Sequence, residues 1–269
     1  MIPDEVLRAA DAGALFVKND SGGKDSAASG LVIETFVPPW QQLVIHATLG
    51  ESEWPGALEK AREHAQHANA DFIVVQAKHT FLEKVQQRFE TRPSVPSFPS
   101  PAMRWCTSDL KTRVLNSAII KYAAANGYTS VVNVMGLRAQ ESRRRAAKPP
   151  CRVHPTYTLQ PKQYKNGTSK VGRQWLEYLP IHDLSTEEVF GRIADAGLTP
   201  HHAYALGNER MSCTFCIMGC SGDLRNGAVH RPELYRKYVE MERQTGWAFH
   251  ASMKPLPQIT GIHPDEELR

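Results

Sequence analysis

The chain has 269 residues, with 32 Lys and Arg against 28 Asp and Glu, a formal net charge of +4, and 41% hydrophobic residues. This composition excludes intrinsic disorder and collagen, and a chain of this length can bury a full core without disulfides. No apolar run approaches the roughly 18 residues that a membrane span needs. The opening residues Met1 to Glu5 contain neither a basic leader nor an apolar segment, which is not the pattern of a signal peptide. We therefore expect a cytoplasmic protein without a membrane partner, whose five cysteines are reduced.

Short apolar runs alternate with helical patterns through the first half of the chain. The runs are rich in β-branched residues, as buried parallel strands are, and they lie at 14–17, 43–47, 72–75 and 131–134. Helical patterns occupy 24–36, 56–68, 80–89 and 108–126. A further strand is expected at 176–181. The alternation predicts a doubly wound, mostly parallel α/β sheet, in which ligands bind at the carboxyl ends of the strands.

The second half of the chain is less regular. Residues 91–101 are rich in proline and predict a loop or lid, and residues 137–175 predict a long basic loop. A helix cap is expected at Ser185, and a helix over 232–244 follows a Cys-rich turn. We expect a nucleotide-binding domain over 1–199 and a Cys-rich helical C-terminal extension over 200–269 that completes a metal site.

The first predicted strand leads directly into Ser21-Gly22-Gly23-Lys24-Asp25-Ser26, and a helical pattern follows. Two adjacent glycines let backbone amides approach an anion, the helix N-terminus adds partial positive charge, and Lys24 adds a full one. The loop is not a Walker A motif, because Lys18 stands where that motif needs Gly and Asp25 where it needs Ser or Thr. It predicts a phosphate-binding turn; an ordinary Gly-rich turn is the less favoured interpretation.

This loop resembles the SGGxDS loop of the ATP pyrophosphatase (PP-loop) superfamily. Further motifs are similar to those of its phosphoadenosine phosphosulfate reductase family: His46 to Glu51, Arg104 to Lys111, Gly136 to Arg143, and Glu209 to Cys216. Together the motifs span roughly residues 13–220. The resemblance implies a five-stranded parallel sheet of the adenine nucleotide alpha hydrolase type, with ATP and Mg²⁺ bound across its carboxyl edge.

The resemblance also implies roles for individual residues. The phosphates would be held by the loop residues Ser21, Gly22, Gly23, Lys24, Asp25 and Ser26. Thr48 and Gly50 would face the adenine or ribose, and the turn containing Gly136 and Arg138 would close over the nucleotide. Glu141 and Arg143 would lie near the phosphate or the acceptor. Catalysis is expected to rest on Lys24, Asp25, Arg138 and Arg143.

Four of the five cysteines lie in two short motifs. Cys213 and Cys216 have the CxxC spacing of a metal site, Cys220 extends it, and Cys106 is a candidate fourth ligand. Four thiolates suit either Zn²⁺ or a [4Fe–4S] cluster, and the spacing does not choose between them. The resemblance favours the cluster, because several sulfur-transferring branches carry one; the motifs are closest to the DNA phosphorothioation type. Cys220 is the least secure ligand, since a three-cysteine cluster with an open iron is an alternative.

The fifth cysteine, Cys151, follows Pro149 and Pro150 beside a basic run. A surface cysteine without a role is favoured over a catalytic thiol. His182, His201 and His202 could reach a metal or phosphate, although ordinary hydrogen-bonding roles are favoured for all three.

Positive charge is concentrated after the predicted nucleotide turn. The basic residues are Arg143, Arg144, Arg145, Lys148, Arg152, Lys162, Lys165, Lys170 and Arg173, and the aromatic residues interleaved with them are Tyr157, Tyr164 and Trp175. This pattern suits a single nucleic-acid strand or a flipped base. It equally suits a flexible lid or a solvated face.

Three functions follow from these features. The favoured one is an ATP-dependent sulfurtransferase that adenylates a nucleic-acid phosphate or base, with sulfur supplied by a donor such as a cysteine desulfurase. The second is a sulfonucleotide reductase acting on phosphoadenylyl or adenylyl sulfate; against it, the chain has Gly261-Ile262-His263 but no cysteine after Cys220. The third is a non-catalytic nucleotide- or nucleic-acid-binding protein with structural zinc.

Overall fold

The computed structural model describes residues 1–163, 169–170, 172–211 and 213–264. The chain forms two compact units. The first unit contains Met1–His46, Leu58–Val75 and Leu115–Pro200, and the second contains Ala47–Ala57, Gln76–Val114 and His201–Arg269. The second unit thus combines two segments from the first half of the chain with the Cys-rich region.

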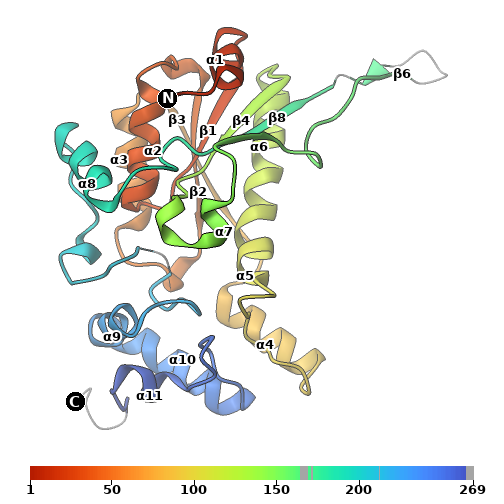
Figure 1. The fold of residues 1–269 in the computed structure, drawn as a ribbon. Helices are drawn as coiled ribbons and strands as arrows, with labels where there is room; N and C mark the ends of the chain where they lie inside the picture. Colours follow the sequence, from red (N-terminus) through yellow and green to blue (C-terminus); the bar gives the residue numbers. More distant parts are fainter. Residues whose placement is uncertain (164–168, 171, 212, 265–269) are drawn as a thin grey trace. The chain divides into compact units, whose positions relative to one another are not determined.

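A six-stranded sheet forms the centre of the first unit, with the strand order β3-β2-β1-β4-β8-β5 (Figure 1). The strands are β1 (Leu15–Asn19), β2 (Gln42–Thr48), β3 (Asp71–Gln76), β4 (Ser130–Val134), β5 (Cys151–Val153) and β8 (Gln174–Tyr178). β1 is parallel to β2 and β4, and β4 is parallel to β8. The expected mostly parallel α/β sheet is confirmed. Its size is corrected from five strands to six, because β5 from the predicted long loop pairs antiparallel with β8.

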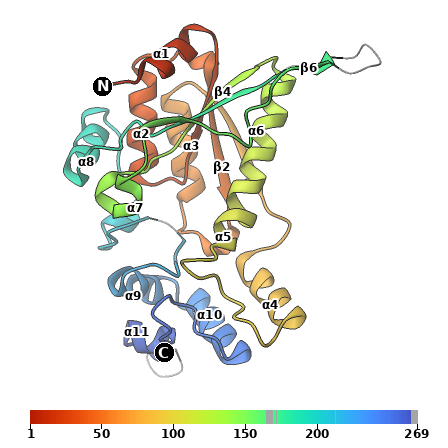
Figure 2. The ribbon, with the colours of Figure 1, turned by 45° about the vertical axis from the view of Figure 1, so that its right-hand side comes forward.

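Helices cover both faces of this sheet (Figures 1 and 2). α2 (Lys24–Glu34), α3 (Ala57–His67) and α8 (Thr186–Asp195) lie on one face, α6 (Arg113–Ala125) lies on the other, and α1 (Asp4–Asp11) packs near β4. Successive strand residues point to opposite faces. Accordingly, Leu15 and Val17 pack with Ile119 of α6, whereas Phe16 packs with Ile33 of α2.

The remaining elements of the first unit are short. They are η1 (Pro39–Gln41), η4 (Ala139–Glu141), α7 (Arg143–Ala146), β6 (Lys162–Gln163) and β7 (Ser169–Lys170). β6 and β7 pair antiparallel in a separate ladder that extends from the sheet (Figure 2). α8 begins at the expected cap, where Ser185 and Glu188 form a reciprocal capping box.

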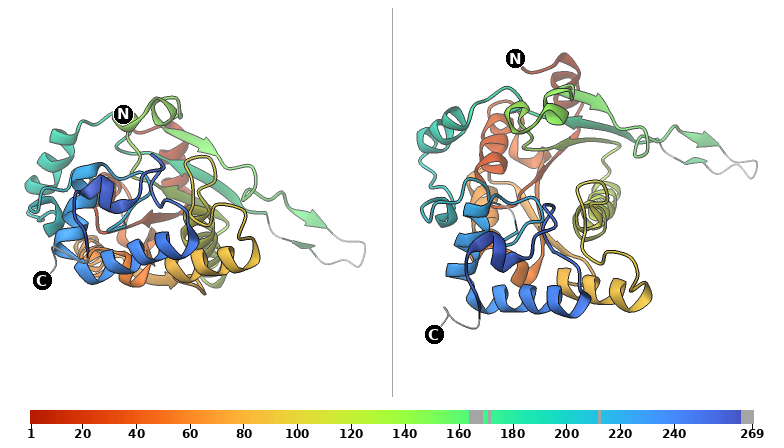
Figure 3. Two further views of the ribbon diagram at one scale, coloured as in Figure 1. Left: turned by 90° about the horizontal axis from the view of Figure 1, so that it is seen from below. Right: turned by 60° about the horizontal axis from the view of Figure 1, so that its bottom comes forward.

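The second unit is mainly helical (Figure 3). Its elements are η2 (Gly50–Ser52), α4 (Phe81–Thr91), α5 (Trp105–Thr107), the π-helical turn η3 (Ser108–Thr112), η5 (His202–Tyr204), α9 (Ser221–His230), α10 (Pro232–Thr245) and α11 (Leu256–Thr260). α10 contacts α4, α9 and α11. Its core is aromatic: Phe81 stacks on Trp105 and on Tyr238, with ring centroids 5.5 Å apart in both pairs. No helix within the described residues is both long and apolar enough to cross a membrane.

Candidate functional site

The phosphate-binding turn predicted from the sequence joins β1 to α2 in the first unit. Gly22 has a φ of +75°, which glycine adopts without the strain that a side chain would add. Gly23 is the N-cap of α2, so the first amides of this eleven-residue helix follow directly. Such amides have no partner within the helix and carry its partial positive charge. The turn therefore has the backbone geometry of an anion site.

The side chains of the turn are held by the protein itself. Lys24 is 3% exposed, with Nζ 3.3 Å from Asp25 Oδ2 and 5.9 Å from the centre of the Phe190 ring. The Ser26 hydroxyl donates to the carbonyl of Gly23 over 2.8 Å, and Ser21 is exposed. The structure thus gathers the predicted residues 21–26 in one turn, with Lys24 fixed beside Asp25.

Arg138 reaches this turn from the loop after β4. Its Nε donates to Asp25 Oδ1 over 2.7 Å, and its Nη1 donates to Gln140 Oε1 over 2.7 Å. The Arg138 backbone amide donates to the carboxylate of Glu141, which forms an ion pair with Arg145. Arg138 is 4% exposed, and removing it would leave Asp25 with Lys24 as its remaining ion-pair partner among the described residues.

Gly136 explains why the two loops can approach so closely. A Cβ at this position would lie 2.7 Å from the carbonyl oxygen of Asp25 and 2.8 Å from its carbonyl carbon. These are backbone atoms that cannot swing aside, so a side chain at 136 would push the loop after β4 away from the turn. The structure thus brings Gly136 and Arg138 into direct contact with Asp25, while their closure over a nucleotide stays a prediction.

Two predicted nucleotide contacts, Thr48 and Gly50, belong to the second unit. The Thr48 hydroxyl donates to Glu53 Oε2 over 3.1 Å and accepts from the amide of Gly50 over 3.2 Å. Gly50 has a φ of +58° at the start of η2. Their role toward adenine or ribose stays a prediction.

Arg143 lies in α7 and is exposed, as is Arg144. Within the described part of the chain, neither side chain forms an ion pair or hydrogen bond, whereas Arg145 and Arg152 pair with Glu141 and Glu177. Lys165 and Tyr164, predicted to extend the basic segment, lie outside the described residues.

Three of the predicted metal ligands come together in the second unit. The charges of Cys106, Cys213 and Cys216 act on one another, and all three act on Lys111. Burial raises the pKa of Cys213 to about 11 and also raises the pKa of Cys106. The negative charge of Cys213, with that of Glu53, raises the pKa of Lys111. Cys106, Cys213 and Cys216 thus interact electrostatically with one another and with Lys111, and we call these four residues the thiol group.

The aromatic core holds the segments that carry these thiols. Trp105, adjacent to Cys106, stacks on Phe81, and Phe215, between Cys213 and Cys216, lies 5.0 Å from Tyr238 between ring centroids. Such aromatic pairs add about 0.5–1.5 kcal/mol beyond their burial. Backbone pairing also holds Cys213, which forms an isolated antiparallel bridge with Glu53.

Cys220 has a different setting. Its Sγ accepts from the amide of Asp223 over 3.4 Å and thereby caps α9. Within the described ranges, no group of three or more His, Cys, Asp or Glu side chains is arranged to hold a metal ion. The sulfur atoms of the thiol group are of the type that binds zinc or an iron–sulfur cluster. In this structure, however, the described residues are not arranged as a complete set of metal ligands.

Cys151, His182, His201 and His202 each contact other residues of the protein, as residues with a structural role do. Cys151 lies in β5 and packs against the core beside Tyr178; burial raises the pKa of its thiol, which disfavours the reactive thiolate. His182 contacts Asp183 and the carbonyl of Arg145. His201 contacts the carbonyl of Pro55, and the His202 ring lies edge-on to Trp54.

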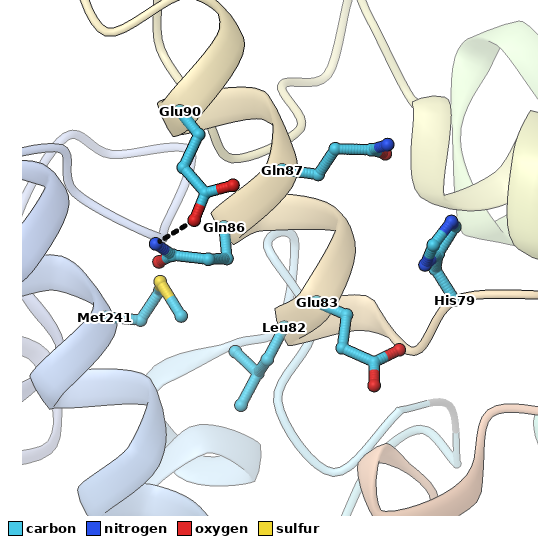
Figure 4. Close-up of a pocket in the computed structure, with 7 residues that line it drawn as sticks. All are labelled: His79, Leu82, Glu83, Gln86, Gln87, Glu90 and Met241. Atoms are coloured by element: carbon cyan, nitrogen blue, oxygen red, sulfur yellow. Dashed lines mark hydrogen bonds between the residues drawn. The ribbon is translucent and has the colours of Figure 1, made fainter.

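A pocket of about 400 Å³ lies elsewhere in the second unit, along α4 and beside Met241 of α10 (Figure 4). Its wall includes Leu82 and a hydrogen-bonded pair in which Gln86 donates to Glu90 over 2.8 Å. None of the predicted site residues lines it.

Lys111, Asp20 and His64 are not among the site residues predicted from the sequence. Lys111 ends the motif Arg104 to Lys111, five positions after Cys106. Asp20 immediately precedes the turn and is 4% exposed, and His64 lies in α3 with its Nδ1 2.9 Å from Asp20 Oδ2. No sequence signal marks the last contact, because only the fold brings α3 to the turn.

The phosphoadenosine phosphosulfate reductase domain family matches residues 16–219, and the chain belongs to this family. The matched region includes the turn, Gly136, Arg138, Cys106, Cys213 and Cys216, and it ends one residue before Cys220. The predicted family is thus confirmed.

Other similarities are more distant. An uncharacterized 37.8 kDa protein encoded in the gpa 5′ region of Escherichia phage 186 is 29% identical over 146 residues, which make up 54% of this chain and 39% of that protein. A phosphoadenylyl-sulfate reductase from Candida auris in its phosphate complex has 15% identity and a TM-score of 0.48, covering 79% of this chain and 88% of that one. The U34-tRNA thiolase NcsA from Methanococcus maripaludis with its [4Fe–4S] cluster has 12% identity and a TM-score of 0.41, covering 96% and 86%.

Proposed function

We propose that the protein is an ATP pyrophosphatase of the sulfurtransferase type, which adenylates a nucleic-acid phosphate or base and then exchanges oxygen for sulfur. The observation that carries the nucleotide half of this proposal is the turn itself. Its amides, Lys24 and the Arg138–Asp25 pair are assembled within one unit from segments far apart in the sequence. Phosphoryl chemistry depends mainly on such positioning and charge stabilisation.

The first step would be adenylation. An acceptor oxygen attacks the α-phosphorus of ATP, the bond from that phosphorus to the bridging oxygen breaks, and pyrophosphate leaves with the electron pair. The turn would bind the phosphates through its amides, and Lys24 would stabilise the negative charge that accumulates as pyrophosphate departs. Asp25 would hold Lys24 and Arg138 in place, and ATP would bring Mg²⁺ with it.

The second step would be sulfur insertion. The terminal sulfur of a persulfide, supplied by a donor such as a cysteine desulfurase, attacks the activated acceptor atom, and AMP leaves with the original oxygen. A separate thiol then attacks the donor-side sulfur of the new disulfide. The acceptor keeps the terminal sulfur as a thiolate, and the thiol and donor remain joined as a disulfide.

The thiol group supports a sulfur-handling role. Cys106, Cys213 and Cys216, with Cys220 as a candidate fourth ligand, would hold a [4Fe–4S] cluster, and the positive charge of Lys111 would offset the negative charge of the thiolates. When bound, such a cluster supplies redox-active iron coordinated by cysteine sulfur. Zinc is the alternative metal for the same donors.

The exposed arginines of α7 support a nucleic-acid acceptor. Arg143 and Arg144 present positive charge that no acidic side chain of the described chain neutralises, and phosphates attract such groups. We expect an Arg143→Ala/Arg144→Ala variant to bind single-stranded DNA or RNA more weakly and with a smaller salt dependence. Arg8→Ala, an exposed arginine of α1, is the matched control and should bind as the unaltered protein does.

The proposal is tested with anaerobically purified protein. We expect visible iron–sulfur absorption, pyrophosphate release from ATP with Mg²⁺, and sulfur-containing nucleotides in mass spectra of nuclease digests when DNA or RNA, a desulfurase and cysteine are present. ATP binding without turnover, in a colourless protein with one zinc, would instead support the non-catalytic alternative.

A sulfonucleotide reductase is the second candidate, because the family is named for that activity. The C-terminal segment speaks against it. Ile262 is buried and its carbonyl accepts from the Tyr235 hydroxyl over 2.8 Å, and Ile259 and Thr260 precede Gly261-Ile262-His263 where a reductase would carry its attacking cysteine. Release of sulfite from phosphoadenylyl or adenylyl sulfate with a dithiol reductant, without pyrophosphate release from ATP, would favour this second function.

A further inference from the structure

A buried carboxylate lies directly behind the phosphate-binding turn. Asp20 is 4% exposed; its Oδ1 accepts from the amide of Gly22 over 2.7 Å, and its Oδ2 accepts from Nδ1 of His64 over 2.9 Å. One carboxylate therefore connects the left-handed residue of the turn to the middle of α3.

The backbone of Asp20 is held as firmly as its side chain. The Asp20 amide donates to the carbonyl of Ile45 over 2.9 Å, and its carbonyl accepts from Nδ1 of His46 over 2.8 Å. His46 is fully buried in β2 and His64 is 6% exposed. The residue that leads into the turn is thus fixed from β2, while His64 fixes the direction of its carboxylate.

The charge of Asp20 creates a difficulty for a phosphate site. A carboxylate two residues before the phosphate-binding amides repels an anion, and it repels more strongly where water is excluded. Hydrogen bonds to a carboxylate stabilise its charge and offset its burial. Lys18 also interacts electrostatically with Asp20, but its Nζ lies 3.1 Å from Glu34, so that cation is already engaged. His64 is the direct side-chain partner of the Asp20 carboxylate.

We propose that His64 is a positioning residue for nucleotide binding: it aims the Asp20 carboxylate at the Gly22 amide and offsets the negative charge behind the phosphates. This inference rests on the proposed nucleotide function and deepens it, because it assigns a role to a residue of α3 that lies outside the sequence motifs. It predicts that Asp20 becomes harmful to nucleotide binding when His64 is lost.

The test compares His64→Ala with the double variant Asp20→Asn/His64→Ala. The probe is α,β-methylene-ATP with Mg²⁺, measured by calorimetry, because its methylene bridge prevents cleavage. We expect His64→Ala to bind the probe about tenfold more weakly, as loss of a hydrogen bond to a charged group implies. The double variant should recover most of the affinity, since the asparagine side chain carries no charge and its amide oxygen can still accept from Gly22.

The matched control is His67→Ala on the same helix, where Nδ1 of His67 contacts Glu34 over 2.8 Å rather than the turn. It should bind the probe as the unaltered protein does. Equal affinity of His64→Ala and the unaltered protein would overturn the proposal, as would a double variant no tighter than His64→Ala when both melt normally.

A second measurement does not depend on nucleotide. Hydrogen exchange of the Gly22 amide in the ligand-free protein should be about tenfold faster in His64→Ala, because the carboxylate that accepts from this amide is no longer held. Unchanged exchange would contradict the proposal. If the unaltered protein failed to bind the probe, the proposed function would fail, while the exchange measurement would still decide the role of His64.

Discussion

The phosphate-binding turn and the thiol group are built in opposite ways. The turn relies on backbone: a glycine with positive φ, the first amides of a helix, and a loop packed so closely that position 136 has no room for a side chain. The thiol group relies on side chains that interact electrostatically with Lys111 and whose segments are held by an aromatic core. We therefore expect nucleotide binding at the turn to be sensitive to changes in backbone contact. Metal binding by the thiol group should instead be sensitive to changes in the donor atoms.

The largest effect is expected from Lys24→Ala, which removes the buried cation of the turn. Pyrophosphate release should fall about 100- to 1,000-fold, the usual loss when one charge-stabilising group is deleted. Metal content should stay the same, because the thiol group is assembled in the other unit. Lys60→Ala, which removes a surface ion pair with Glu63, is the control. Loss of metal from the Lys24→Ala variant would contradict the expectation that the turn and the thiol group are separate sites.

The Cys213→Ser variant tests the opposite outcome, in which metal is lost and nucleotide binding is retained. This change replaces one thiol of the CxxC pair by a hydroxyl, a poorer ligand for iron or zinc, so most of the metal should be lost while nucleotide binding persists. The control is Cys151→Ser, which changes a cysteine of β5 outside the thiol group and should leave the metal content of the protein unchanged. Elemental analysis and calorimetry with the ATP analogue measure the two outcomes. A Cys213→Ser protein with full metal content would show that the thiol group is not the metal site.

Gly136→Ala should weaken nucleotide binding about tenfold, since overpacking of this kind costs about 1–3 kcal/mol. The new Cβ would contact the Asp25 carbonyl at 2.7 Å. Gly191→Ala is a fair control, because no atom lies within 4 Å of its added Cβ and alanine favours the helix. Equal probe affinity of the two variants would mean that the close packing at Gly136 does not shape the turn.

The smallest effect is expected from Cys220→Ala. If Cys220 acts only as the cap of α9, the change lowers the free energy of unfolding by about 0.5–1 kcal/mol. The metal then stays in place. Metal loss equal to that of Cys213→Ser would instead make Cys220 a fourth ligand. Parallel melting and metal analysis of the two variants decide between three and four ligands.

Much of the first unit was predictable because its signals are local. Apolar runs marked β1, β2, β3 and β4, and the glycine pair marked the start of α2 at Lys24. β5 could not be recognised, since Cys151–Val153 has only three residues and follows two prolines. The motif residues of the turn were also readable from sequence, and their grouping followed from the family.

The unpredicted parts of the site depend on contacts between distant segments. Nothing in the neighbourhood of His64 indicates that it meets Asp20, 44 positions away. Likewise, the CxxC spacing named Cys213 and Cys216 but did not indicate a lysine beside them. Whether Cys220 joins them depends on the direction of one side chain at a helix start, which spacing does not specify.

The contact between Arg138 and Asp25 joins residues 113 positions apart. A nascent chain that has formed β1 and α2 but has not yet paired β4 lacks Arg138 and Gly136, so it has only part of the anion site. Nucleotide should therefore recognise the completed sheet in preference to its precursors, and a ligand that binds only the native state stabilises it by mass action. Under the proposed function, ATP would thus stabilise molecules in which β1 and β4 are paired over molecules in which they are not.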